Sequence, residues 1–254
     1  MSVSAPGRRF LGTTSGVSNS AGSCGGGAAP EAVYRVVLTV ASDLFVTTHG
    51  TRFDTVIYVR NGCCGTELAC NNDIDGRRTS ALSATNLPAG NYDVFVDGAT
   101  AADVGAFSVD IFVSPKSSSP GDSCGRPAHI ADMPLTGNTC VMRDDAQGSC
   151  QANAGGADAI YYFVLDQATM VSFNTCSGTC IDTVLSVRDV CTDGGGGSER
   201  ACNDDGPCSG CMGSPGSQSR VSVTLTAGVH YVIVDTFPGM PCGAYTLTPI
   251  SVPP

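Results

Sequence analysis

The sequence predicts an all-β protein made of two tandem antiparallel β-sandwich modules of jelly-roll type, held together by disulfides. Three observations lead to this prediction. Apolar residues alternate with polar ones along many short segments, which is the pattern of strands with one buried face. The 254 residues include 32 glycines, 14 prolines and 14 cysteines. The most strand-like segments also occur twice, in the same order.

The choice of charged residues favours strands and turns over helices. Of the 23 acidic residues only Glu31, Glu67 and Glu199 are glutamates, and Lys116 is the one lysine among 13 basic residues. Glutamate and lysine are typical of helix surfaces, whereas aspartate, asparagine, serine and glycine close turns. The chain is also long enough for two modules that each bury a core. We therefore expect almost no helix.

An internal repeat divides the chain into two copies of one module. The segment Asp-Thr-Val-Ile-Tyr-Val-Arg at 54–60 matches Asp-Thr-Val-Leu-Ser-Val-Arg at 182–188. The offset between matched positions grows along the chain, which insertions in loops of the second copy would produce. The other matched pairs are 69–73 with 201–205, 90–97 with 228–235, and 105–107 with 243–245.

A polar stretch rich in proline and serine marks the predicted boundary between the copies, because it follows the last apolar alternation of the first copy. We assign 1–114 to the first sandwich, 115–121 to a linker and 122–254 to the second sandwich. The second copy has a long lead-in before its first strong strand at 160–165. The lead-in of the first copy is shorter and lacks two cysteines, so we expect that copy to be shortened at its N terminus.

Six half-buried strands are expected in the first copy. Phe107, Val109 and Ile111 alternate with Ser108 and Asp110, so one face of that strand is predicted to be buried. Six antiparallel strands in about 110 residues are typical of a sandwich. The expected strands are 33–39, 44–48, 55–60, 79–87, 92–97 and 106–113.

Cysteine content and charge restrict the compartment and the partners. Fourteen cysteines, an even number, are typical of an oxidising compartment, so we expect an extracellular or cell-surface location. The net charge of −10 disfavours phosphate backbones and anionic head groups, so nucleic acid is not expected as a partner. No apolar run has the length of a membrane span, so membrane insertion is not expected either. The partners that we expect are proteins. Because the chain carries a net negative charge, divalent cations are also candidate ligands.

The repeated motifs resemble the pre-peptidase C-terminal domain family, and in particular its cysteine-bearing relatives in bacterial secreted and surface proteins. The resemblance covers both copies, and it implies a non-catalytic β-sandwich, often an accessory to secreted proteases and similar to collagen-binding modules. No protease domain is present in the chain for such a module to serve. In the second copy the motifs are Asp-Thr-Val-Leu-Ser-Val-Arg at 182–188, Ala-Cys-Asn-Asp-Asp at 201–205, Leu-Thr-Ala-Gly-Val-His-Tyr-Val-Ile-Val-Asp at 225–235 and Gly-Ala-Tyr-Thr-Leu at 243–247.

The cysteine spacing predicts a disulfide across the same loop of each copy. In the second copy Cys191 and Cys202 span this loop, and in the first copy it is spanned by Cys63 or Cys64 together with Cys70. Because the two loops occupy the same place in a duplicated fold, we predict that Cys191 pairs with Cys202, and that Cys70 pairs with Cys63 or Cys64. Closing each loop would stabilise the module by about 2–3 kcal/mol.

A calcium-like spacing occurs at Asn71-x-Asp73-x-Asp75-Gly, where oxygen ligands stand at alternate positions and glycine follows. The pattern departs from a calcium loop because its twelfth position is Leu82, which has no ligand atom. In the second copy the alternation is lost at 203–205. Two interpretations remain, a Ca²⁺ site formed by the three oxygen-bearing residues or polar side chains that cap turns.

Nothing in the sequence predicts a catalytic site. The three histidines share no position in the repeat, so no Ser-His-Asp constellation is built twice. Asp54 and Asp182 each begin a strand, but they belong to different copies and are expected to bond loop amides. Cys208-Ser-Gly-Cys211 has the spacing of a redox or zinc motif, yet no second such pair or nearby histidine completes it. We therefore expect that the protein is not an enzyme.

Two functions are consistent with these features. The first is a structural or adhesive module that acts through protein contacts in a repeat array or polymeric surface assembly. The alternative is an accessory module of a larger secreted protein. Such a module would bind a matrix protein or a polysaccharide in a calcium-dependent way. The absence of tryptophan disfavours an aromatic platform for sugars.

One form of assembly follows from the short lead-in of the first copy. A strand donated by the segment 245–252 of a neighbouring subunit would complete a sandwich that lacks an edge. In the alternative interpretation, residues 2–14 supply that strand within the chain.

Overall fold

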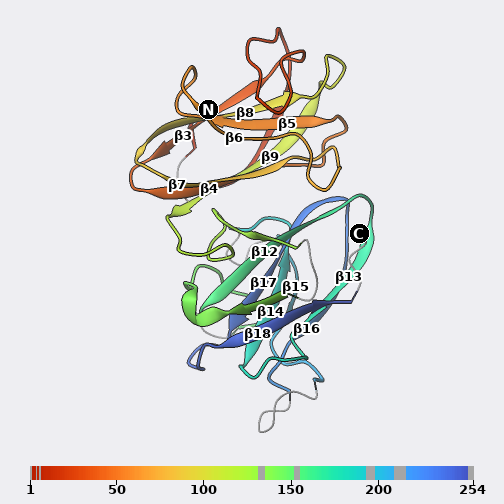
Figure 1. The fold of residues 1–254 in the computed structure, drawn as a ribbon. Coiled ribbons are helices and arrows are strands. Elements are labelled where there is room, and N and C mark those ends of the chain that lie inside the picture. Colours follow the sequence, from red (N-terminus) through yellow and green to blue (C-terminus); the bar gives the residue numbers. More distant parts are fainter. Residues whose placement is uncertain are drawn as a thin grey trace. The chain divides into compact units, whose positions relative to one another are not determined.

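A computed structural model describes residues 2–3, 5, 7–130, 135–151, 155–192, 198–208 and 216–250. The chain divides into two compact units, Met1–Ser117 and Ser118–Pro254, which run from red to yellow-green and from green to blue in Figure 1. Strands dominate both units. In the described ranges the one helical segment is a short 3₁₀ turn, η1 (Thr139–Val141). The prediction of an all-β protein is confirmed.

Two sheets form the first unit. The larger sheet has the strand order β1-β3-β8-β5-β6 and the smaller has the order β2-β9-β4-β7. All neighbours are antiparallel except β1 and β3, which are parallel. The strands are β1 (Ser2–Val3), β2 (Gly7–Thr13), β3 (Ala32–Leu38), β4 (Ser42–His49), β5 (Thr55–Arg60), β6 (Glu67–Asn71), β7 (Ala81–Leu87), β8 (Gly90–Gly98) and β9 (Ala106–Pro115).

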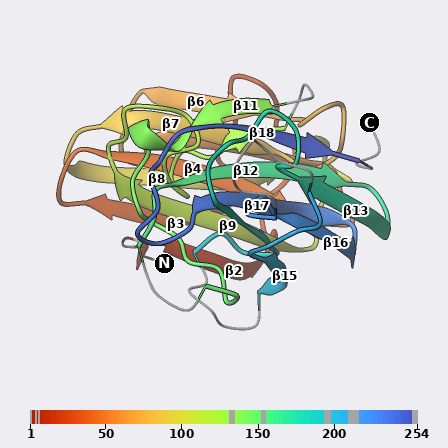
Figure 2. The same ribbon diagram turned by 90° about the horizontal axis from the view of Figure 1, so that it is seen from below.

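The second unit repeats this topology strand for strand. Its sheets have the orders β10-β12-β17-β14-β15 and β11-β18-β13-β16, and β10 is again parallel to β12. Figure 2 shows these strands in a view turned by 90°. The strands are β10 (Ala128–His129), β11 (Leu135–Asn138), β12 (Asp158–Leu165), β13 (Thr169–Asn174), β14 (Thr183–Arg188), β15 (Glu199–Asn203), β16 (Arg220–Leu225), β17 (Gly228–Thr236) and β18 (Ala244–Pro249).

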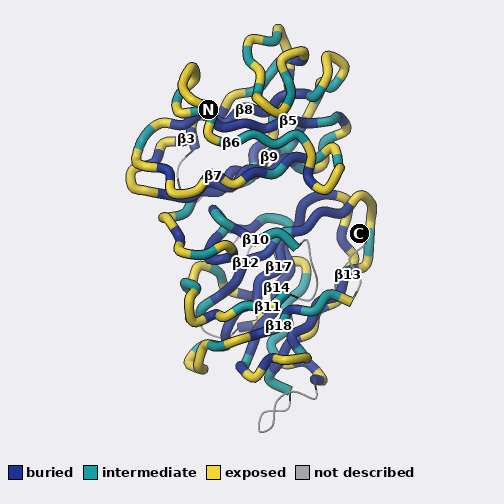
Figure 3. Tube along the Cα trace, in the orientation of Figure 1, coloured by how far each residue is buried: buried dark blue, intermediate teal, exposed yellow. Residues whose placement is uncertain are grey.

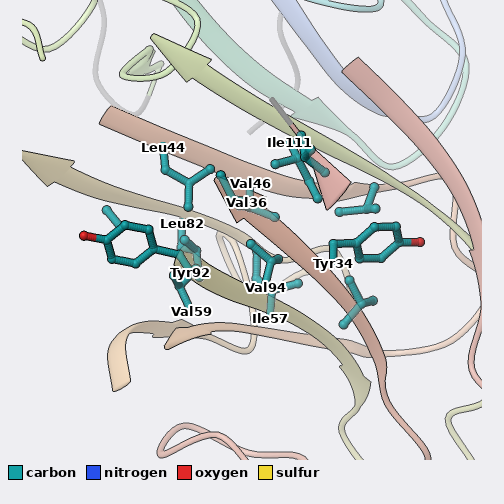
Figure 4. Packing of buried hydrophobic residues seen from close by; sticks show 14 of the residues in the cluster. Tyr34, Val36, Leu44, Val46, Ile57, Val59, Leu82, Tyr92, Val94 and Ile111 are labelled. Carbon is teal, nitrogen blue, oxygen red and sulfur yellow. The ribbon is translucent and has the colours of Figure 1, made fainter. Parts of the chain in front are cut away.

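The core of the first unit lies between its two sheets. Val36 and Val94 come from the larger sheet, Val46 and Ile111 come from the smaller one, and all four are fully buried in one cluster. Figure 4 shows these side chains pointing toward one another. Burying each such side chain stabilises the fold by roughly 1.5–3 kcal/mol. Figure 3 shows the same arrangement along the chain, with buried strands and exposed connections in each unit. The alternation in the sequence therefore corresponds to a sandwich.

All six strands expected in the first copy are present, but three others were missed. The expected segments correspond to β3, β4, β5, β7, β8 and β9, with β5 at the predicted bounds. The missed strands are β1, β2 and β6, which lie at the edges of the sheets. Edge strands are short or interrupted by charge, so their pattern in the sequence is weak.

The first unit does not lack the edge segment that its short lead-in suggested. Strand β2 pairs with β9 as β11 pairs with β18, and Thr14 and Thr139 bond Gly105 and Gly243 in the same way just after those strands. The expected shortening of this edge is therefore wrong, because residues within 2–14 supply the strand.

The donated strand proposed for the C-terminal segment is also contradicted. Strand β18 already pairs with β11 and β13, and its side chains Tyr245 and Leu247 are buried in the core of their own unit. Moving this strand to another subunit would expose that core. The last residues of the segment, 251–252, lie outside the described residues.

A buried carboxylate fixes the exit of the chain from the first unit. Asp43, fully buried in β4, accepts hydrogen bonds from the backbone nitrogen of Asn86 at 2.7 Å and from the backbone nitrogen and hydroxyl of Ser117 at 2.8 and 2.6 Å. Hydrogen bonds to a charged acceptor are stronger than neutral ones. The first residues of the predicted 115–121 linker are thus bonded to the first sandwich.

Candidate metal centre and disulfide framework

Three aspartates meet at one end of the second sandwich. Asp182 immediately precedes β14, while Asp204 and Asp205 immediately follow β15. Because β14 and β15 are antiparallel neighbours, with Leu185 opposite Asn203, the start of one and the end of the other lie at the same end of the sheet. One carboxylate oxygen from each aspartate lies within 4.8 Å of the others. This geometry brings together the donor atoms that a hard divalent cation prefers.

Two oxygens in this acidic group are buried without a hydrogen-bond partner, namely Oδ1 of Asp182 and Oδ1 of Asp204. Burial, followed by the charges of Asp204 and Asp205, raises the pKa of Asp182 to about 6. Burial and the charge of Asp205 also raise the pKa of Asp204. Buried carboxylates without a partner are unfavourable, and a bound cation would supply the missing partner and lower both pKa values.

The backbone that carries these aspartates is held by short polar side chains. The Ser219 hydroxyl donates to the carbonyl oxygens of Asp204 and Thr183, which joins the two segments. Asn203 donates to the carbonyl oxygen of Asp205 at 3.1 Å and accepts from the backbone nitrogen of Arg220 at 2.8 Å. The three carboxylates are therefore positioned by hydrogen bonds that leave their own oxygens available.

The first unit repeats the arrangement with one substitution. Asp54 precedes β5, and Asn72 and Asp73 follow β6, in the positions that correspond to the three aspartates of the second unit. Oδ1 of Asp54 and Oδ1 of Asn72 are again buried without a hydrogen-bond partner. Burial, then the charges of Asp73 and Asp103, raises the pKa of Asp54. The Ser80 hydroxyl donates to the carbonyls on both sides, as Ser219 does. The unpartnered oxygens are thus a duplicated feature.

Of the residues predicted to bind calcium, Asp73 belongs to this group. Asn71 instead holds the turn, because its amide nitrogen donates to the Asp73 carbonyl at 3.0 Å and its Oδ1 accepts from the backbone nitrogen of Ala81 at 2.9 Å. Asp75 forms an ion pair with Arg77 at 3.2 Å. Sequence reasoning missed Asp54, although its recurrence before a strand in both copies was a usable signal.

The observed disulfide pairing differs from the predicted one. Cys191 pairs with Cys124, not with Cys202, and neither Cys63 nor Cys64 pairs with Cys70. The loop cysteine Cys191 and the strand cysteines Cys70 and Cys202 are each bonded to a cysteine of the segment that leads into their sandwich. The bonds observed between described cysteines are Cys24–Cys70, Cys124–Cys191, Cys140–Cys242, Cys150–Cys202 and Cys176–Cys208.

Two of these bonds are equivalent in the repeat and tie the lead-in of each unit to the edge strand β6 or β15. Beside Cys24–Cys70 the Ser23 backbone and hydroxyl donate to Glu67, and a serine bonds Glu199 beside Cys150–Cys202 in the same way. Cys208 of the predicted CxxC spacing is bonded to Cys176, and Cys211 lies outside the described residues. These disulfides indicate an oxidising compartment.

A second pair of carboxyl groups is buried inside the second unit. Asp158 on β12 and Asp235 on β17 are opposite each other in the antiparallel pair, and they are 0% and 3% exposed. Asp158 accepts from the backbone nitrogens of Asp145 and Ala146 at 2.8 and 2.9 Å. Burial raises the pKa of Asp158 well above its usual value and that of Asp235 to about 7. This pair is a source of pH dependence on the face of the sheet that the lead-in segment covers.

The fold and these sites define a duplicated, disulfide-bonded all-β protein. No family model matches the chain, and no curated protein matches it. In the described part of the chain no helical segment has the length and hydrophobicity needed to cross a membrane.

Among solved structures, the chain is similar to a pre-peptidase C-terminal domain of a collagenase from Bacillus anthracis, with 10% identity and a TM-score of 0.31 over 44% of this chain and 94% of that one. It is also similar to an isomalto-dextranase from Arthrobacter globiformis, with 10% identity and a TM-score of 0.26 over 85% of this chain and 36% of that one. It is similar as well to a cycloisomaltooligosaccharide glucanotransferase from a Paenibacillus species, with 11% identity and a TM-score of 0.22 over 90% of this chain and 44% of that one. Likenesses of this size carry no functional argument.

Proposed function

We propose that this chain is a non-catalytic extracellular module pair that acts through protein contacts in a repeat array or surface assembly, and that a calcium ion organises one end of each sandwich. The observation that carries the proposal is the duplicated set of buried, unpartnered oxygens at Asp54 and Asn72 in one unit and at Asp182 and Asp204 in the other. A feature kept in both copies is the kind on which an array of equivalent modules would rely. Disulfides in both units support the extracellular compartment.

Calcium fits the donor set better than other common cations. All the candidate donors are carboxylate or amide oxygens, which Ca²⁺ accepts in flexible geometry, whereas zinc favours nitrogen and sulfur. Three acidic groups come together in the second unit, and asparagine replaces one of them in the first. Fewer charges weaken calcium binding, so we expect the second unit to bind more tightly. Affinities on the order of 10⁻⁴ to 10⁻³ M are typical of extracellular modules.

Binding is tested on the full chain by isothermal titration with CaCl₂ and by melting in calcium and in EDTA. Binding to the folded state alone raises the melting temperature, so wild type should melt higher in calcium. Asp204→Ala should lose most of the rise that belongs to the second unit, whereas Asp204→Asn, which recreates the donor set of the first unit, should only reduce it. Asp166→Asn, an exposed carboxylate on the turn after β12, is the matched control and should behave as wild type. Equal melting of wild type in calcium and EDTA would contradict the cation site.

The assembly part is tested separately by light scattering over a range of protein concentrations. We expect the average mass to grow with concentration in calcium and to return to that of one chain in EDTA. A protein that stays monomeric in calcium but binds a matrix protein or polysaccharide in a screen would favour the ligand-binding alternative over the array. Because calcium can stabilise a module that does not assemble, a rise in melting temperature without growth in mass would contradict the assembly and leave the cation site standing.

A further inference from the structure

The turn between β5 and β6 places two adjacent cysteines at its tip. The backbone nitrogen of Gly65 donates to the Gly62 carbonyl at 3.3 Å, so Cys63 and Cys64 are the two central residues of a tight turn. Gly62 has a φ of +72°, and a Cβ at Gly65 would lie 1.8 Å from the carbonyl oxygen of Asn61. Both cysteines are exposed. The flanking glycines thus permit a turn in which the two side chains project together.

The two sulfurs contact each other, because Sγ of Cys63 and Sγ of Cys64 are 3.1 Å apart. Every other cysteine that the structure describes is disulfide-bonded. Among the described cysteines, Cys63 and Cys64 are therefore the two that form no disulfide. They face each other in a protein whose remaining described cysteines are oxidised.

The repeat explains why these cysteines differ from their counterpart. Cys63 corresponds to Cys191 in the alignment that matches 54–60 with 182–188, and Cys191 is bonded to Cys124, which precedes the first strand of its unit. Within residues 1–117 the first cysteine is Cys24, and it is already bonded to Cys70. The first unit has no cysteine in the place of Cys124 but has an additional one beside Cys63.

We propose that Cys63 and Cys64 form a vicinal disulfide that acts as a reversible redox site at the tip of the β5–β6 turn. In its formation the two thiols react with the disulfide of a small-molecule or protein oxidant. One sulfur–sulfur bond forms between Cys63 and Cys64, the oxidant's sulfur–sulfur bond breaks, and two electrons and two protons pass to it to give two thiols. This proposal stands apart from the calcium site and from assembly.

Reversibility follows from exposure and from the place of the bond in the chain. Cys24–Cys70 closes a loop of 46 residues, and the fold holds its ends together through the Ser23–Glu67 hydrogen bonds. A bond between adjacent residues closes no such loop and lies in solvent, where a thiol can attack it. In the reduced pair the hydrogen bond to Cys64 raises the pKa of Cys63, which lowers the fraction of reactive thiolate.

The bond itself is tested on the full chain purified from an oxidising compartment. The protein is unfolded with a thiol-blocking reagent present and cleaved after arginine and glutamate. This releases residues 61–67, which contain Cys63 and Cys64 and no other cysteine. The expected peptide is unlabelled and about 2 Da lighter than the dithiol, the mass of the two hydrogens lost. Two labels on the unreduced peptide, or its linkage to any other peptide, would overturn the proposal.

Reversibility is tested with increasing concentrations of dithiothreitol under native conditions. We expect Cys63 and Cys64 to gain two labels at concentrations that leave Cys24 and Cys70 unlabelled, and to lose them after treatment with oxidised glutathione. Simultaneous opening of both disulfides would refute the redox site. Cys64→Ser is the matched variant, because Cys63 should then be labelled without reduction while Cys24–Cys70 remains intact.

Discussion

The buried carboxyl of Asp235 should make the second unit less stable as the pH rises, and Asp235→Asn should remove that effect. The folded state holds the pKa of Asp235 at about 7, against an ordinary value of 3.8, because the side chain is 3% exposed. The folded protein therefore binds a proton that the unfolded chain releases. Its contribution to stability is complete below the ordinary pKa and is lost as the pH rises through about 7.

The magnitude follows from the two pKa values. Each unit of pKa difference corresponds to about 1.4 kcal/mol, so ionising Asp235 costs about 4 kcal/mol over the whole range. Between pH 5 and pH 8 the loss is about 3 kcal/mol, because roughly two units of that interval lie below the folded pKa. Asparagine has a similar shape and no charge, so the variant should lack this part of the pH dependence. Asp158 shifts in the same direction and is present in both proteins.

The assay is urea unfolding at pH 5 and pH 8 in EDTA, followed by circular dichroism, with the two units fitted as separate transitions. We expect Asp235→Asn to be more stable than wild type at pH 8 by a larger margin than at pH 5. Asp166→Asn, an exposed carboxylate of the same unit, should keep the wild-type pH dependence. An unchanged pH dependence in Asp235→Asn would refute the reasoning.

The other predictions concern single contacts in the first unit, measured as shifts of the urea midpoint with the slope unchanged. Asp43→Ala should destabilise that unit by about 3 kcal/mol, because Asn86 and Ser117 lose a charged acceptor; an equal effect on the second transition would contradict this. Gly12→Ala should cost about 1–3 kcal/mol, since the new Cβ would lie 2.4 Å from the Phe107 ring, and a neutral result would show that the ring moves freely.

The sequence predicted the strands with clear apolar alternation, including the edge strand β7, and missed the edge strands β1, β2 and β6 for a physical reason. Val109 and Ile111 alternate with polar neighbours, so β9 was recognisable. Strand β2 contains Arg9, whose guanidinium bonds the fully buried carboxylate of Asp110 directly opposite, at 2.7 and 2.8 Å. A charged residue in a strand interrupts the apolar alternation. That its charge is paired with a residue of the neighbouring strand becomes visible only in the folded sheet.

Only part of the candidate site was predicted, because its ligands come from the ends of separate strands. Asp73 was identified from local spacing, while its neighbour in space, Asp54, precedes the whole of β5 and β6 in the sequence. The repeat identified Cys70 and Cys202 as equivalent, but the partners predicted for them were wrong, because these cysteines bond Cys24 and Cys150. Both partners lie in lead-in segments whose path depends on the fold, and connectivity of many cysteines does not follow from spacing.

The disulfides of the second unit also determine how far it can stretch under force. Pulled between Cys124 and Cys242, a chain of this length without cross-links would extend to about 400 Å. The shortest covalent path instead contains only the segment 124–140, which extends to about 55 Å. A module that unfolds under tension would therefore act as a short tether rather than a long one. The one disulfide on that path is Cys140–Cys242.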